Sequence, residues 1–110
     1  MVTHWKSHPQ SDYVVSAICE LKILYGITLS SSERLSKAYE SILKGRFPIL
    51  AFNEHCAGVY ADLLSDFALK GQSRPAFDLM IAATAIANGL ELATCNAVDF
   101  QNITGLMVMD

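Results

Sequence analysis

The chain has 110 residues, of which 52% are apolar and 17% charged, so it can build one hydrophobic core and is not a disordered tail. No apolar run approaches the roughly 18 to 20 residues that cross a bilayer, and we expect a single domain over residues 1–110 with no membrane partner. The formal net charge of −3 argues against broad electrostatic capture of nucleic acid, so nucleic-acid chemistry would require a local site.

The chain alternates helical periodicity with short apolar runs. Apolar residues at i, i+3, i+4 and i+7 predict helices, and runs of four to seven residues rich in β-branched, aromatic or aliphatic side chains predict strands. The predicted helices cover residues 2–8, 16–26, 30–45, 53–71 and 78–89, and the predicted strands cover 12–15, 47–52, 90–96 and 106–110.

Several of these helices have recognisable ends. Ser16 and Asn53 are of the types that cap a helix N-terminus, and Ser30-x-x-Glu33 has the spacing of a capping box. Gly26 is a plausible terminator for the second helix, because glycine readily adopts the left-handed backbone that ends helices.

The alternation of helices and strands predicts an α/β sandwich with a largely parallel sheet, because a helical crossover returns the chain in the same direction. The alanine-rich helix over 78–89 should pack closely against that sheet. The three cysteines, Cys19, Cys56 and Cys95, are odd in number and stand in apolar surroundings. They predict buried thiols in a reducing compartment, and we take the cytoplasm as the expected location.

Three acidic residues stand where such a sheet would bring them together. Glu20 and Asp78 lie in first helical turns and Asp99 follows a strand, so all three fall at the edge formed by the strands' carboxyl ends. Crowded carboxylates favour a hard cation such as Mg²⁺ or Mn²⁺. Singly, each has a simpler interpretation, as a helix-dipole partner or a turn residue. Arg74 and Lys22 are weaker candidates for contacting phosphate or a partner's carboxylate.

Longer segments resemble a known family. SAICELKILYG (16–26), FPILAFNEHCAGVYADL (47–63) and, most strongly, RPAFDLMIAATAIANGLELATCNAVDF (74–100) resemble, in order, the motifs of PIN-domain ribonucleases of the VapC toxin type. In the last segment the pattern is Asp-x-x-Ile-Ala-Ala-x-Ala, a short strand, then Thr-x-Asn-x-x-Asp-Phe. The resemblance covers nearly the whole chain from about residue 12 onward.

This resemblance implies a PIN-like α/β/α sandwich and Mg²⁺- or Mn²⁺-dependent endonucleolytic cleavage of RNA. It also implies control by a cognate antitoxin and assembly as a homodimer. Carried over by residue, the resemblance makes Glu20, Asp78 and Asp99 the catalytic, metal-binding carboxylates and makes Asn96, Thr94 and Ser16 polar residues that line the pocket.

One feature departs from the family pattern. The family begins with an apolar strand that ends in Asp-Thr or Asp-Ser and lies centrally in the sheet, and we expect that first strand to be missing from this chain. The departure favours an alternative function, a catalytically impaired remnant that acts as a protein-binding module. A related DNase or a non-toxin RNA-processing nuclease is a weaker alternative.

Overall fold

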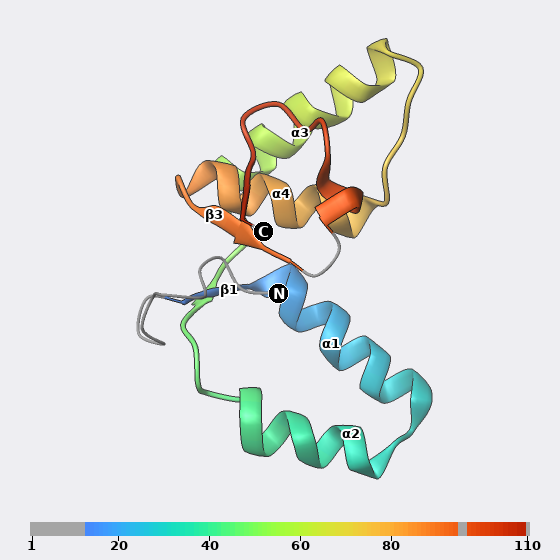
Figure 1. The fold of residues 1–110 in the computed structure, drawn as a ribbon, viewed down its shortest axis with the longest axis vertical. Helices are drawn as coiled ribbons and strands as arrows, with labels where there is room; N and C mark the ends of the chain where they lie inside the picture. Colours follow the sequence, from blue (N-terminus) through green and yellow to red (C-terminus); the bar gives the residue numbers. More distant parts are fainter. Residues whose placement is uncertain (1–12, 95–96, 110) are drawn as a thin grey trace.

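The computed structural model describes residues 13–94 and 97–109, which form a small α/β fold (Figure 1). The helix expected over 2–8, the start of the first strand, Cys95 and Asn96 lie outside the described residues. The elements, in chain order, are β1 (Val15–Ser16), α1 (Ala17–Ser30), α2 (Glu33–Ala38), the π-helical turn η2 (Tyr39–Leu43), β2 (Ile49–Leu50), α3 (Glu54–Leu69), α4 (Ala76–Ala87), β3 (Glu91–Ala93), the 3₁₀ turn η3 (Ala97–Phe100) and β4 (Met107–Met109).

The described strands pair in parallel, as the sequence predicts. β1 pairs with β2 in the register Val15 to Ile49, and β3 pairs with β4 in the register Leu92 to Val108. Within residues 13–94 and 97–109 these pairs form two separate two-stranded sheets. The expectation of an absent central strand stays a prediction.

The strands are shorter than the apolar runs that predicted them. The run over 47–52 forms only the two residues of β2, and Ile49 is 50% exposed. The reason is its partner: the chain enters α1 directly after Ser16, so β1 has two residues and the ladder ends with it. Continuous apolar character therefore overestimated both the length and the burial of this strand.

The core lies around α4. Leu79, Ile81, Ala82 and Ala83 are almost fully buried there, and the helix packs against α3 and also contacts α1, β1 and β3. This alanine-rich helix was expected to pack against the sheet; it contacts β1 and β3, but its main partner is α3. Cys19 and Cys56 are buried free thiols, which confirms that expectation for two of the three cysteines.

Two predicted helix ends are wrong. α1 continues through Gly26 to Ser30, and its C-cap Ser31 takes the left-handed backbone with φ 53°. An interior glycine costs only about 1 kcal/mol relative to alanine, so it did not stop the helix. The N-cap of α2 is Ser32, whose hydroxyl accepts from the Leu35 amide, and not Ser30.

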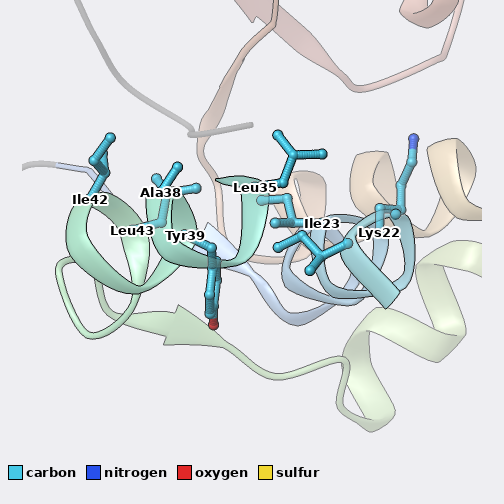
Figure 2. Close-up of a pocket in the computed structure, with 9 residues that line it drawn as sticks. Lys22, Ile23, Leu35, Ala38, Tyr39, Ile42 and Leu43 are labelled. Carbon is cyan, nitrogen blue, oxygen red and sulfur yellow. The ribbon is translucent and has the colours of Figure 1, made fainter. Parts of the chain in front are cut away.

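The segment from α1 to η2 extends from the core as a helical hairpin (Figure 1). Neither α2 nor η2 contains a buried residue. Their apolar face instead borders an open groove of about 440 Å³ against α1. The groove is lined by Lys22, Ile23, Gly26, Ile27, Leu35, Ala38, Tyr39, Ile42 and Leu43 (Figure 2). None of the helices within the described ranges is long and apolar enough to span a membrane.

Candidate functional site

Glu20 is placed by the start of α1. The Ser16 hydroxyl accepts a hydrogen bond from the Cys19 amide at 3.0 Å and thereby caps the helix, as predicted. Glu20 then falls in the first turn, half-buried, and its Oε1 accepts a hydrogen bond from the Tyr39 hydroxyl of η2. This hydrogen bond, together with burial and the charges of Glu20 and Glu40, raises the pKa of Tyr39 above its ordinary value of 10.0.

Asp78 lies in the first turn of α4. The helix begins at Ala76 after Pro75, whose fixed φ suits a helix start, and Pro75 gives no side-chain cap. Asp78 is only 8% exposed, and its Oδ1 lies 3.1 Å from Nζ of Lys22 on α1. A carboxylate this buried requires a positive partner, and Lys22 supplies it.

Asp99 differs from the other two carboxylates because it is exposed on η3. Its segment is held by Arg74, whose guanidinium donates to the main-chain oxygens of Asp99 at 3.2 Å and Gln101 at 2.8 Å. The same guanidinium stacks 4.9 Å over the ring of Phe67. Arg74 therefore joins the loop before α4 to η3 and α3, a positional role that the sequence did not indicate.

The three expected pocket-lining residues have different outcomes. The hydroxyl of Ser16 is engaged in capping α1. Thr94 directly follows β3 and is half-buried. Asn96 lies outside the described residues, so its role stays a prediction.

The fold brings the elements that carry the acidic residues together around α4, which contacts α1 and η3, without gathering their side chains. α1 begins where β1 ends, η3 follows the carboxyl end of β3, and η3 contacts α4 near its start (Figure 1). Yet among residues 13–94 and 97–109 no three Asp, Glu, His or Cys side chains are placed to hold a metal ion. In this arrangement the expected metal ligands do not fit a divalent cation, since Asp78 is paired with a lysine and Glu20 with a tyrosine.

Sequence reasoning missed those two partners. Lys22 was assigned to phosphate or a partner's carboxylate, and the structure instead pairs it with Asp78. Tyr39 lies within the helix expected over 30–45, and a tyrosine hydroxyl on the apolar face of a helix usually needs a polar partner. Its hydroxyl was the one signal that could have indicated the contact with Glu20.

Comparison with known proteins agrees with this fold. The PIN domain family model matches residues 3–106, and the chain belongs to that family. Its relatives are VapC ribonucleases. "Ribonuclease VapC1" of Rickettsia felis is 31% identical over 108 residues, covering 96% of this chain and 79% of that protein. The "tRNA(fMet)-specific endonuclease VapC" of Shigella flexneri is 25% identical, covering 92% and 76%.

The solved structures give the same family. DNA-bound VapBC from Salmonella typhimurium superposes with a TM-score of 0.80 at 28% identity, covering 88% of this chain and 74% of that one. The PIN-like α/β fold and the VapC-type toxin family expected from the sequence are therefore confirmed.

Proposed function

We propose that this chain is a VapC-type toxin that cleaves RNA endonucleolytically, depends on Mg²⁺ or Mn²⁺, and is neutralised by a cognate antitoxin. The observation that carries this proposal is Asp78, an almost buried carboxylate in the first turn of α4, joined to the helix that bears Glu20. Such carboxylates at the carboxyl edge of parallel strands suit hydrolytic chemistry at a phosphate. The proposal includes a cytoplasmic location, because that is where an RNA substrate is expected.

The catalytic set in this proposal is Glu20, Asp78 and Asp99. Support for a cation comes from the family resemblance and from the oxygen ligands that Mg²⁺ and Mn²⁺ prefer. Because Asp78 and Glu20 are already partnered, we expect the protein to take up a cation weakly. Transfer RNA is the first substrate class to test, because the Shigella flexneri relative is named for it.

The test is cleavage of end-labelled transfer RNA and messenger RNA by the purified protein with Mg²⁺, with Mn²⁺ and with a chelator. We expect discrete cuts with either cation and none with the chelator. Asp78→Asn should abolish the cuts, and Asp66→Asn, which removes an exposed carboxylate paired with Lys70, should not. Cleavage that persists in chelator would contradict the proposed cation dependence. Absence of all cleavage would contradict the proposed ribonuclease activity.

One observation favours the second candidate, a protein-binding module without activity. Large apolar side chains are exposed on the helical hairpin, including Leu24, Tyr25, Leu29, Leu35 and Ile42. Monomeric proteins rarely expose such groups together, so they suit an antitoxin or the second copy expected from the resemblance. This candidate predicts stable complexes without cleavage, whereas an antitoxin of an active toxin must also suppress cleavage when added back.

A further inference from the structure

The two partnered carboxylates are tied to the two sides of one groove. Lys22 on α1 and Tyr39 on η2 both line the groove between α1 and the α2–η2 segment (Figure 2). Lys22 holds Asp78, and Tyr39 holds Glu20. Whether Asp78 and Glu20 are bound by these partners therefore depends on the position of the helical hairpin.

The ammonium of Lys22 does for Asp78 what a divalent cation would do. It neutralises a carboxylate whose side chain is only 12% exposed, at a distance of 3.1 Å. A cation at Oδ1 would meet this ammonium as a like charge, so the two cannot both occupy the oxygen without repulsion. Lys22 itself is 39% exposed, so its flexible stem can withdraw the ammonium into water.

The Tyr39 hydroxyl occupies Glu20 in a similar way, because its hydrogen bond uses an oxygen that a cation would need. Tyr39 stands at the start of a π-helical turn, and neither that turn nor α2 contributes a buried residue. A segment with so little burial can shift at small cost in free energy. Release of Glu20 therefore does not require the core to open.

We propose that Lys22 and Tyr39 are positioning residues that hold Asp78 and Glu20 closed against divalent cations and so set the cation affinity of the site. This proposal rests on the proposed function, because it takes Asp78 and Glu20 as the cation ligands. The closed state is the arrangement seen here, and the open state has Lys22 in solvent and Tyr39 displaced from Glu20. A partner that moves the hairpin would then shift the balance between the two.

The test measures binding of Mn²⁺ and Mg²⁺ by calorimetry in the absence of RNA. Lys22→Met removes the competing charge and should tighten Mn²⁺ binding about tenfold, the size expected for loss of one charge-assisted hydrogen bond. Lys22→Arg, which keeps the charge, should bind as weakly as the unaltered protein. Lys44→Met is the matched control, because it makes the same change of net charge at an exposed pair with Glu40.

Tyr39→Phe should tighten Mn²⁺ binding about threefold, the effect of a single neutral donor. Tyr25→Phe, at an exposed position on α1, should have no effect. The gain from Lys22→Met should vanish in the double variant with Asp78→Asn, because the ammonium acts through that carboxylate. If Lys22→Met does not fold, Lys22→Gln takes its place in the test, and a thermal melt checks that Lys22→Gln is folded.

Equal Mn²⁺ affinity in Lys22→Met and Lys44→Met would overturn the proposal, as would a gain that survives loss of Asp78. Because calorimetry needs no RNA, the two ideas fail separately. If affinity responds as expected but no RNA is cut, the ribonuclease proposal fails and the closed state stands. If RNA is cut with Mg²⁺ but affinity does not respond, only the closed state fails.

Discussion

Nζ of Lys22 lies 3.1 Å from Oδ1 of Asp78, and this ion pair joins the second turn of α1 to the first turn of α4. The pairing explains how a carboxylate can be almost buried at the start of the most buried helix in the described part of the chain. The helix dipole favours a negative charge at the first turn of α4, and the ammonium of Lys22 neutralises the Asp78 carboxylate. The acidic residue expected to bind metal is thus also a contact between two helices.

Asp78→Asn should abolish cation-dependent RNA cleavage and lower the free energy of unfolding by about 1 kcal/mol. The loss is modest because an asparagine oxygen can still accept from Lys22 and because that lysine is partly exposed. Urea denaturation and the cleavage assay measure the two effects on one preparation. A variant that retained full cleavage would show that Asp78 is only a helix-start carboxylate.

Ser16→Ala should destabilise the protein by about 1 kcal/mol, because the Cys19 amide at the start of α1 loses its acceptor. Ser16→Asn should recover most of the loss, since asparagine caps as well as serine. Ser41→Ala is the control, because the Ser41 hydroxyl bonds to an exposed main-chain oxygen. Equal denaturation midpoints for Ser16→Ala and Ser41→Ala would contradict the capping role.

Local chemistry made the starts of α1 and α3 predictable, but it misplaced the start of α2 and the end of α1. Ser16 and Asn53 each cap through a single hydrogen bond to an amide three residues on, a signal contained within four residues. Gly26 misled because nothing lies within 4 Å of where its Cβ would be and no left-handed backbone is needed there. The left-handed residue is instead the C-cap Ser31, which follows Ser30 and is of a type without a strong preference for that conformation.

The side-chain partners of the acidic residues could not be predicted from the sequence. The positions of Glu20 and Asp78 in first turns follow from the predicted elements. The partners of these residues do not, since Lys22 and Asp78 are 56 residues apart and Tyr39 and Glu20 are 19 apart. Resemblance gave the acidic set, and only the fold showed that two of its members are already engaged.

The phenol of Tyr39 should ionise at a higher pH than ordinary tyrosine, because its hydroxyl donates to the Glu20 carboxylate. A raised pKa means that the neutral phenol is favoured in the folded state. The stabilisation is therefore complete below the ordinary value of 10.0 and is lost as the pH rises through the raised pKa. The ionisation is measured as the near-ultraviolet phenolate absorbance that the unaltered protein gains with pH and the Tyr39→Phe variant does not. A titration midpoint at or below pH 10.0 would contradict the hydrogen bond between Tyr39 and Glu20.

Arg74→Met should lower the free energy of unfolding by about 1 to 2 kcal/mol and loosen the segment that carries Asp99. The guanidinium donates to the main-chain oxygens of Asp99 and Gln101 and stacks on Phe67, and methionine keeps only apolar contact. Amide hydrogen exchange should therefore rise around residues 97–101 and stay unchanged in α3. Arg74→Lys should recover little, because a single ammonium lacks the planar fork that reaches both oxygens.

The control for Arg74 is Arg34→Met, which removes the same charge from an exposed position on α2. If both variants unfold at the same urea concentration, Arg74 is an ordinary solvated loop residue and not the contact that places Asp99. Arg74→Met could raise amide exchange around 97–101 and lower RNA cleavage, while Lys22→Met still tightens Mn²⁺ binding. That combination would show that Asp99 contributes to cleavage through its position. Cation control would in that case remain with Glu20 and Asp78, the two carboxylates that the hairpin holds.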